Sequence, residues 1–254
     1  MAASMAGKTA LVTGGGSGIG KATCLAFARE GAQLSVVDRN LETARQTVQE
    51  IVAAGGQALA QQVDVSREDQ VQGMVEAAVR HFGALDCCFN NAGIGTTETH
   101  SKKKLLADIA LADWQQMLDV NLTGVFLCLK HQLLCMAGRG GAIVNMSSIA
   151  GLTALPGAAA YVASKHGVLA LTRSAAIEYA DLGIRVNAVC PGHLATRIRG
   201  QSNDAADGTL LRNPMKRHGT PEEIAELVVW LASDRASFVN GAAFTADGGR
   251  LAGG

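Results

Sequence analysis

The sequence predicts an α/β fold in which helices cover both faces of a parallel sheet. Short β-branched segments alternate with longer helical ones along the chain, which is the pattern of repeated βαβ units. Gly- and Asn-rich segments follow several of the predicted strands, at residues 14–20, 90–95 and 191–192. Because right-handed crossovers place the carboxyl ends of the strands at one edge, we expect these segments to line one ligand crevice.

The composition is that of a globular protein. Of 254 residues, 48% are hydrophobic and 17% are charged, which suffices for a large core and excludes a disordered chain. Lys and Arg number 22 and so do Asp and Glu, so no net charge attracts nucleic acid or an acidic membrane surface. We therefore expect a soluble protein with neither a nucleic-acid nor a membrane partner.

The first half of the chain alternates four strand segments with three helices. The strands are predicted from short apolar and β-branched runs, beginning with TALVT and QLSVVD, at residues 9–13, 33–38, 58–65 and 85–89. The helices are predicted where apolar side chains recur every three or four residues, as Ala44, Val48 and Ile51 do. They lie at residues 18–30, 41–54 and 68–82.

The second half continues the alternation with three strands and three helices. The strands are predicted at residues 142–147, 184–190 and, from a weaker pattern, 242–246. The helices are predicted at residues 111–136, 158–180 and 221–232. No Pro/Ser-rich linker and no solenoid-type repeat divides the chain, so residues 1–254 are predicted to form one domain.

The cysteines indicate a reducing compartment. None of them has C-x-x-C spacing or clusters with histidine as metal ligands do: Cys24, Cys87, Cys88, Cys128, Cys135 and Cys190. Residues 1–8 lack the pattern of a signal peptide. We therefore expect reduced thiols, no bound metal and a cytoplasmic location. The apolar stretch 122–136 contains Lys130 and His131 and is too short to span a bilayer.

A glycine-rich turn, T-G-G-G-S-G-I-G at residues 13–20, stands between the first predicted strand and helix. Glycine permits a tight turn and lets backbone N–H groups approach a pyrophosphate. The spacing of Gly14, Gly18 and Gly20 differs from the commoner dinucleotide fingerprint G-x-G-x-x-G, and a purely structural turn is the alternative. No Lys–Ser/Thr pair follows the last glycine, which excludes a P-loop.

Acidic residues end the second and third predicted strands. Asp38 follows Gly20 by 18 residues, where a carboxylate accepts hydrogen bonds from both hydroxyls of an adenosine ribose and repels a 2′-phosphate. This favours NAD over NADP, although Arg39 offers a cation to a phosphate. Asp64 is placed either to bind an adenine amino group or to N-cap the helix that begins near Arg67.

Tyr161 and Lys165 lie four residues apart on one face of a predicted helix. A nearby ammonium group favours phenolate, so we expect it to lower the pKa of Tyr161. Ser148, at the end of a predicted strand, can hydrogen-bond a substrate oxygen while Tyr161 exchanges its proton, and Ser147 competes with it for that role. Asn121 is unfavourable inside a helix, so it either packs at a kink or orders a water beside Lys165.

In their order along the chain, these motifs resemble those of the short-chain dehydrogenase/reductase family. The resemblance runs from about residue 8 to residue 249 and includes Thr13-Gly14-x-x-x-Gly18-x-Gly20, Asp64-Val65, Asn90-Asn91-Ala92-Gly93, Asn121, Ser148, Tyr161-x-x-x-Lys165 and Pro191-Gly192. It implies a Rossmann-like, doubly wound fold with a seven-stranded parallel sheet. It also implies a homotetramer built on the helices at 111–136 and 158–180, with the tail 248–254 near another interface.

The resemblance further implies a role for each site residue. Tyr161 would be the catalytic acid/base, Lys165 would hold the nicotinamide ribose and lower the tyrosine pKa, and Ser148 would orient the substrate oxygen. Asn121 would support a proton-relay water. The residues expected to contact the cofactor are Gly14, Ser17, Gly18, Ile19, Gly20, Asp38, Arg39, Asp64, Val65, Asn91, Ala92, Gly93, Tyr161, Lys165, Pro191, Gly192, Leu194 and Thr196.

Two segments are expected to shape the substrate pocket, at about residues 94–112 and 193–217. The first contains Lys102, Lys103 and Lys104, which either attract an anionic substrate or form a solvated charge run. In the second, His193 either lines the pocket or packs at the entrance of the loop.

The leading hypothesis is an NAD-dependent oxidoreductase that interconverts a secondary alcohol and a ketone of a small molecule. An NADPH-dependent 3-oxoacyl-thioester reductase is the alternative within the enzyme class, and Asp38 counts against it. A protein that senses NAD without turnover is the alternative outside that class. The presence of Ser148, Tyr161 and Lys165 together disfavours it.

Overall fold

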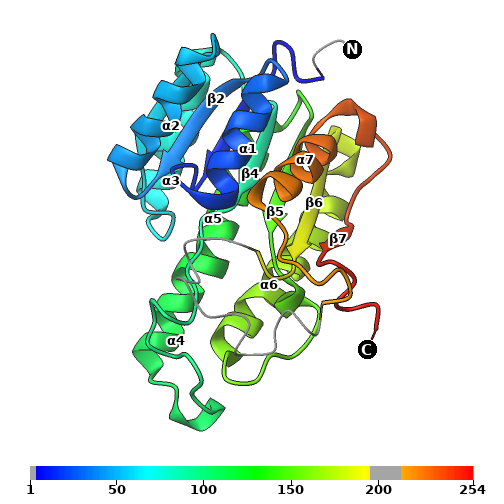
Figure 1. Ribbon diagram of the computed structural model, residues 1–254. Helices are drawn as coiled ribbons and strands as arrows, with labels where there is room; N and C mark the ends of the chain where they lie inside the picture. Colours follow the sequence, from blue (N-terminus) through cyan, green and yellow to red (C-terminus); the bar gives the residue numbers. More distant parts are fainter. Residues whose placement is uncertain (1–3, 195–212, 254) are drawn as a thin grey trace.

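The computed structural model describes residues 4–194 and 213–253. Seven strands within them form one parallel sheet in the order β3-β2-β1-β4-β5-β6-β7 (Figure 1). The strands are β1 (Thr9–Thr13), β2 (Gln33–Asp38), β3 (Ala58–Gln62), β4 (Cys87–Asn90), β5 (Gly141–Met146), β6 (Ile184–Pro191) and β7 (Ala243–Ala246). The chain order reverses between β1 and β4, which opens a crevice beyond their carboxyl ends. The predicted Rossmann-like, doubly wound fold is confirmed.

Helices cover both faces of the sheet. One face carries α1 (Gly18–Arg29), α2 (Leu41–Ala53) and α7 (Pro221–Ala232). The other carries α3 (Glu68–Phe82), α5 (Gly124–Met136) and α6 (Ala159–Glu178). Because successive side chains of a strand point to opposite faces, Val12 of β1 packs in the first cluster and Leu11 in the second.

A further helix, α4 (Leu111–Leu118), extends beyond the carboxyl edge of the sheet (Figure 1). It leads into α5 through a π-helical turn at Asp119–Thr123, so the helix predicted at 111–136 is continuous but contains an irregular turn. Short 3₁₀ turns lie at Leu106–Asp108, Ile149–Gly151, Ala180–Leu182 and Asp234–Ala236.

The predicted element bounds agree with the structure to within two residues, with one larger difference. β3 ends at Gln62 rather than at residue 65 because Asp64 turns the chain. Its Oδ1 accepts hydrogen bonds from the Ser66 N–H at 3.0 Å and the Ser66 hydroxyl at 2.7 Å. The N-cap alternative for Asp64 is wrong, since α3 begins at Glu68 with Arg67 as its cap residue.

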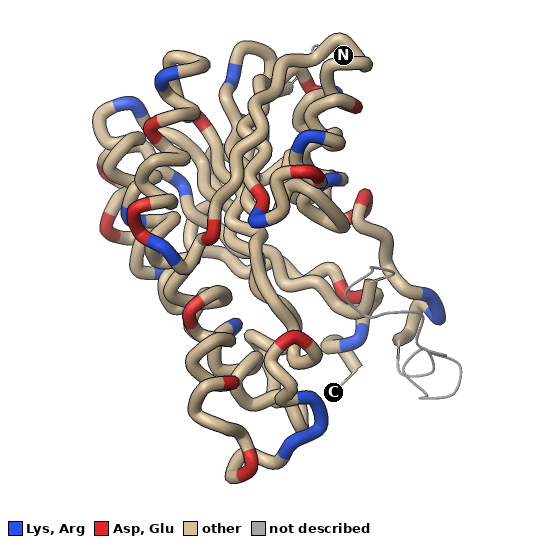
Figure 2. Tube along the Cα trace, turned by 90° about the vertical axis from the view of Figure 1, so that its left-hand side faces the viewer, with Lys and Arg blue, Asp and Glu red and all other residues tan. Residues whose placement is uncertain are grey.

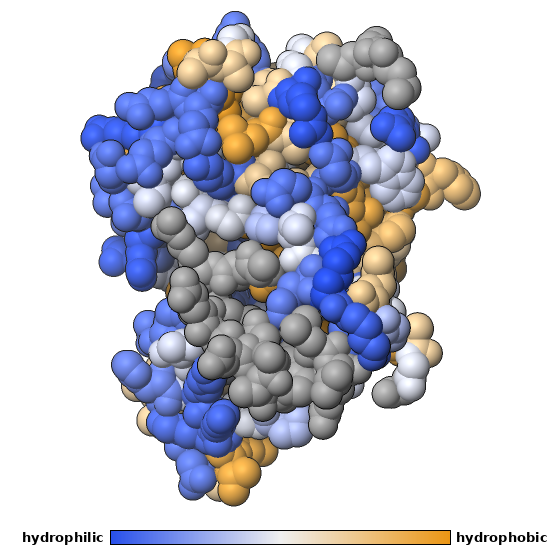
Figure 3. Space-filling model, viewed as in Figure 1, coloured by the Kyte–Doolittle hydropathy of each residue, from blue (hydrophilic) through white to orange (hydrophobic). Residues whose placement is uncertain are grey.

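The surface mixes both signs of charge. Figure 2 shows Lys and Arg interspersed with Asp and Glu, and the longest run of adjacent cations in the sequence is at residues 102–104. Figure 3 shows a hydrophilic left side, with apolar groups at the upper centre, the right edge and the lower tip of this face. Leu105, Leu106 and Leu111 are among the exposed apolar side chains. No helix in the described part of the chain is long and apolar enough to cross a membrane. All six cysteines are free thiols, and five of them are buried.

Candidate active site

A cleft of about 1290 Å³ lies beyond the carboxyl ends of the strands. Small-molecule pockets typically measure about 300–1,000 Å³, so this cleft has room for a dinucleotide together with a substrate. The predicted site residues that line it are Gly14, Ser17, Gly18, Ile19, Asp38, Arg39, Asp64, Val65, Asn91, Ala92, Gly93, Ser148, Tyr161, Lys165, Pro191, Gly192 and Leu194. Gly20 and Asn121 are buried and do not line the cleft. Thr196 lies outside the described residues.

The glycine-rich turn brings backbone close to the cleft. Gly14 has φ +66°, and a Cβ there would lie 2.8 Å from Nδ2 of Asn91. A Cβ on Gly20 would collide with the carbonyl oxygen of Gly14, so glycine lets α1 pack directly against the end of β1. Since α1 begins at Gly18, its unpaired first N–H groups lie beside the cleft, an arrangement that fits a pyrophosphate.

Hydrogen bonds join this turn to the loop after β4. The hydroxyl oxygen of Thr13 accepts from the backbone N–H groups of Asn91 and Ala92, each at 3.0 Å. The side-chain amide of Asn91 donates to the carbonyls of Thr13 at 3.0 Å and Gly14 at 3.3 Å. The residue expected to contact adenosine therefore also fixes the glycine-rich turn.

Asp38 and Asp64 line the part of the cleft beside β2 and β3. The Asp38 carboxylate accepts from the backbone N–H groups of Gly16 at 3.0 Å and Asn40 at 2.9 Å. These bonds hold it at the position where a ribose would bind. Burial raises the pKa of Asp64, but the two hydrogen bonds from Ser66 outweigh it, so the pKa lies below its ordinary value and the group is charged.

The structure separates the two adjacent serines. Ser148 lines the cleft together with Tyr161 and lies close enough to the phenol to lower its pKa, while its hydroxyl oxygen accepts from the backbone N–H of Ala150 at 3.1 Å. Ser147 is buried, and its hydroxyl donates to the carbonyl oxygen of Lys165 at 2.9 Å. Ser148 is therefore the serine that lies beside Tyr161.

The electrostatics of Tyr161 and Lys165 are set mainly by burial. Burial raises the pKa of Tyr161, and the hydrogen bond with Ser148 offsets only part of that effect. Burial also lowers the pKa of Lys165 to about 8, while its Nζ donates to the carbonyl of Met146 at 2.9 Å. The expected lowering of the tyrosine pKa is wrong for this arrangement, because Nζ lies 5.8 Å from the ring centroid and desolvation dominates.

Asn121 occupies the π-helical turn and is fully buried. Its Oδ1 accepts from the N–H of Ile94 at 2.8 Å, and its Nδ2 donates to the carbonyl of Ile94 at 2.9 Å. A Cβ on Gly93 would lie 3.1 Å from Oδ1 of Asn121 and 3.7 Å from Nζ of Lys165, so both side chains face this glycine. This geometry agrees with the first of the two alternatives predicted for Asn121, which is packing at a helix kink.

A buried polar network beneath the site was not predicted. Asn90 and Asn145 are register partners in β4 and β5, and Nδ2 of Asn90 donates to Oδ1 of Asn145 at 2.9 Å. Gln132 of α5 exchanges two hydrogen bonds with Asn90, and Asn145 donates to Thr172 of α6 at 3.0 Å. The sequence signal for this network is that polar residues stand within otherwise apolar segments, because buried polar groups need hydrogen-bond partners. The network connects β4 and β5 with two helices: α5, which follows the turn that contains Asn121, and α6, which contains Tyr161.

The described segments that flank residues 195–212 are joined at the rim of the cleft. Leu194 forms a β-bridge with Gly219, whose N–H donates to the carbonyl of His193 at 3.1 Å. His193 lines the cleft beside this bridge, and its role at the substrate stays a prediction.

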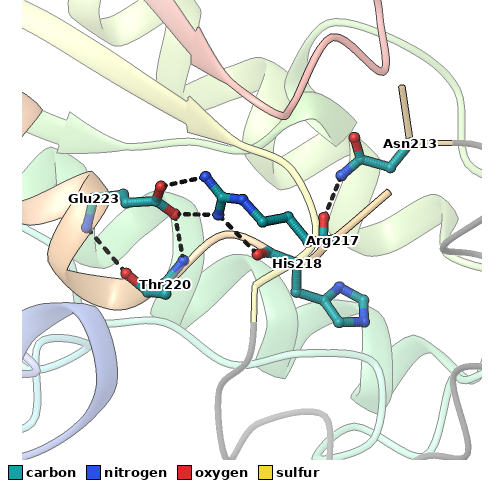
Figure 4. Close-up of polar contacts among 5 residues, drawn as sticks. All are labelled: Asn213, Arg217, His218, Thr220 and Glu223. Atoms are coloured by element: carbon teal, nitrogen blue, oxygen red, sulfur yellow. Dashed lines mark hydrogen bonds and ion pairs between the residues drawn. The ribbon is translucent and has the colours of Figure 1, made fainter. Parts of the chain in front are cut away.

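The start of α7 then fixes residues 213–219 (Figure 4). Arg217 donates to both carboxylate oxygens of Glu223, at 2.9 and 2.6 Å. Thr220 and Glu223 form a capping box at the start of the helix. Asn213 donates to the carbonyl of Arg217 at 2.7 Å, so the chain that enters α7 is held from both sides.

Comparison with known proteins identifies the family. A family model described as enoyl-(acyl carrier protein) reductase matches residues 14–250. Cyclohexanol dehydrogenase of Acinetobacter sp. (strain SE19) is 45% identical over 242 residues, which cover 95% of this chain and 94% of that protein. The chain belongs to the short-chain dehydrogenase/reductase family.

Other members extend the match over the whole chain. Cis-4-hydroxycyclohexanecarboxylate dehydrogenase of Sinomonas cyclohexanicum is 42% identical over 254 residues, covering 99% of this chain and 100% of that protein. The crystal structure of levodione reductase matches with a TM-score of 0.91 at 38% identity, covering 98% of this chain and 99% of that one. The prediction that this short-chain dehydrogenase/reductase is an oxidoreductase acting on alcohol and ketone groups is confirmed.

Proposed function

We propose that the protein uses NAD to interconvert a secondary alcohol and a ketone in a small cyclic molecule. The observation that carries the proposal is that Ser148 and Tyr161 lie beside each other in a cleft that also contains Asp38 and Lys165. The names of the relatives support a cyclic substrate, since they refer to cyclohexanol and hydroxycyclohexanecarboxylate.

The preference for NAD rests on Asp38. Its carboxylate is held by two backbone N–H groups at the end of β2, where it can accept hydrogen bonds from ribose hydroxyls and repel a 2′-phosphate. Arg39 lines the same part of the cleft, but its side chain is exposed and screened by water. An NADPH-dependent 3-oxoacyl-thioester reductase is therefore disfavoured.

The proposed mechanism assigns the proton to Tyr161. NAD, when bound, supplies the nicotinamide that accepts or returns the hydride, and the glycine-rich turn, Asp38, Asp64, Asn91 and Lys165 would hold it. Tyr161 removes the hydroxyl proton during oxidation and returns it during reduction. Ser148 donates a hydrogen bond to the substrate oxygen as its charge changes. Lys165 would hold the nicotinamide ribose, and Asn121 positions the backbone of Ile94 in the loop that lines the cleft.

The segments 94–112 and 193–217 are proposed to shape the substrate side of the cleft. Residues 94–98, Lys102 and Lys103 of the first line the cleft, as do His193, Leu194 and Pro214 of the second. The segment 153–158, which follows β5, also lines it and was not predicted to do so.

We also propose a cytoplasmic homotetramer of chains that each form one domain. The buried free thiols support the location. Apolar side chains that remain exposed on α5 and α6, among them Leu134 and Ile177, support the assembly, because exposed apolar patches mark association surfaces.

Replacement of Tyr161 by Phe tests the proposed function. With NAD and cyclohexanol, we expect kcat to fall by about 10²- to 10⁴-fold, measured by the absorbance of reduced nicotinamide, because the acid/base group is lost. Tyr179→Phe alters the second of the two tyrosines and is the matched control, with activity expected to persist. Turnover that survives in Tyr161→Phe contradicts the mechanism. Tight NAD binding without turnover on a panel of cyclic alcohols and ketones favours the sensing alternative.

A further inference from the structure

Arg250, near the end of the chain, lines the same cleft as Ser148 and Tyr161. Its side chain is half-buried, and Nη1 of the guanidinium group is buried and has no hydrogen-bond partner among the described residues. A buried N–H of a cation that donates to nothing costs free energy, and such groups are rare in folded proteins. The buried Nη1 of Arg250 therefore requires an explanation.

The nearby acidic side chains do not neutralise Arg250. Asp247 is the closest carboxylate along the chain, but its oxygens accept from the backbone N–H groups of Gly249 and Leu251, each at 2.9 Å. Glu98 also lines the cleft, and its carboxylate accepts from the N–H of Gly95 at 3.2 Å. Among the described residues, Arg250 forms no ion pair.

Two further cations line the same cleft. Lys102 and Lys103 belong to the run of adjacent cations at residues 102–104, and neither forms an ion pair with a described residue. By contrast, their neighbour Lys104 pairs with Asp113 at 3.2 Å. The backbone N–H of Lys103 donates to the carbonyl of Gly157 at 3.1 Å, which fixes the lysines at the cleft. Together with Arg250 they make the substrate side of the cleft positively charged.

The cleft also offers apolar contacts beside these cations. Leu155, Pro156, Pro214 and Leu251 all line it. Their side chains would cover a hydrocarbon ring, while a charged substituent on that ring would reach the guanidinium group. An arginine fork matches the two oxygens of a carboxylate, which a neutral alcohol does not supply.

We propose that the substrate carries a carboxylate, which binds to the guanidinium group of Arg250. This inference rests on the proposed function and names its substrate class: a cyclic secondary alcohol or ketone with a carboxylate on the ring. The hydroxyl lies at Tyr161 and the carboxylate at Arg250, while Lys102 and Lys103 attract the anion to the cleft.

The test compares two substrates in the wild type and in Arg250→Gln. The substrates are cis-4-hydroxycyclohexanecarboxylate and cyclohexanol, each with NAD. We expect Arg250→Gln to lower kcat/KM for the carboxylate by about 10- to 100-fold, mainly through KM, because a charge-assisted hydrogen bond is lost. Activity with cyclohexanol is expected to remain, which shows that the variant folds. Arg139→Gln removes the same charge from an exposed site and is the control.

Binding measurements separate this inference from the proposed function. Titration calorimetry of the carboxylate with NAD is done in the Tyr161→Phe variant, in which turnover is suppressed, and we expect the additional Arg250→Gln substitution to weaken binding about 10- to 100-fold. Unchanged binding, an equal loss of activity with both substrates, or a higher KM for NAD overturns the inference. Arg250-dependent binding without turnover of either substrate upholds the carboxylate site but contradicts the proposed use of NAD on a small cyclic alcohol or ketone.

Discussion

At the scale of single residues, the burial of Lys165 couples the site to stability. The side chain is 4% exposed, and its pKa falls from the ordinary 10.5 to about 8. Between these two values the unfolded chain binds more protons than the folded one, so this residue makes the free energy of unfolding rise with pH. Below pH 8 Lys165 is charged in the folded protein, and the free energy of unfolding is lowered by the full cost of burying that charge.

Comparison with Lys165→Met measures that cost. From below pH 8 to above pH 10.5, we expect the free energy of unfolding of the wild type, minus that of the variant, to rise by about 3 kcal/mol. Urea denaturation across this range provides the measurement, and the other titrating groups cancel because both proteins contain them. A difference that stays constant with pH would show that the ammonium is not desolvated.

The adjacent serines give a second prediction at this scale. Ser148→Ala should lower kcat by about 10²- to 10³-fold, because it removes the hydroxyl that faces the substrate oxygen. Ser147→Ala should leave kcat nearly unchanged and lower the free energy of unfolding by about 1 kcal/mol, through loss of the bond to Lys165. Steady-state kinetics and urea denaturation on both variants decide the assignment, and equal activities would refute it.

Single residues of the site were predictable where the chain itself brings them together. Tyr161 and Lys165 share a helix, so their spacing alone placed them side by side. Ser147 and Ser148 were not separable by position, because adjacent residues at a strand end differ only in the direction of their side chains. Arg250 had no signal, since its access to the cleft depends on the path of an irregular tail.

At the scale of elements, the π-helical turn explains why a buried asparagine lies within a helix. The side chain of Asn121 forms two hydrogen bonds with the backbone of Ile94, which belongs to the loop that follows β4 and lines the cleft. The local sequence predicted a regular helix because the apolar pattern continues on both sides of the turn. The partner of Asn121 lies in a different element, and no spacing within the helix points to it.

Asn121→Ala tests this coupling between helix and loop. Both backbone groups of Ile94 lose their partner, so we expect the free energy of unfolding to fall by about 2 to 4 kcal/mol. The amide of Ile94 should also exchange faster with solvent, as measured by hydrogen exchange mass spectrometry. Gln116→Ala, on the exposed side of α4, is the control and should do neither. Unchanged exchange at Ile94 would mean that the loop holds its shape without the asparagine.

At the scale of the whole molecule, the exposed apolar side chains on α5 and α6 predict association. Leu134 is 65% exposed and Ile177 is 81% exposed. We expect the wild type to be a tetramer by light scattering, and the double variant Leu134→Lys, Ile177→Lys to dissociate because burying two ammonium groups is costly. Val52→Lys, at an exposed apolar position on α2, should leave the mass unchanged. A monomeric wild type would contradict the proposed assembly.

The architecture as a whole was predictable because one simple rule generates it. Alternating strands and helices with right-handed crossovers lead to a parallel sheet whose carboxyl edge collects the loops. The rule does not extend to features that depend on distant pairs. The network of Asn90, Gln132, Asn145 and Thr172 joins two strands and two helices, and the segment 153–158 reaches the cleft without any periodic pattern.

The position of β1 in the middle of the sheet has a consequence for biosynthesis. β1 pairs with β2 on one side and with β4 on the other, from Ala10 opposite Cys87 to Thr13 opposite Asn90. The nascent chain therefore exposes one edge of a strand that is wholly buried in the finished protein until residue 90 has left the ribosome. Closure of the sheet centre must wait for that moment, so the half-made protein is the form most dependent on chaperones.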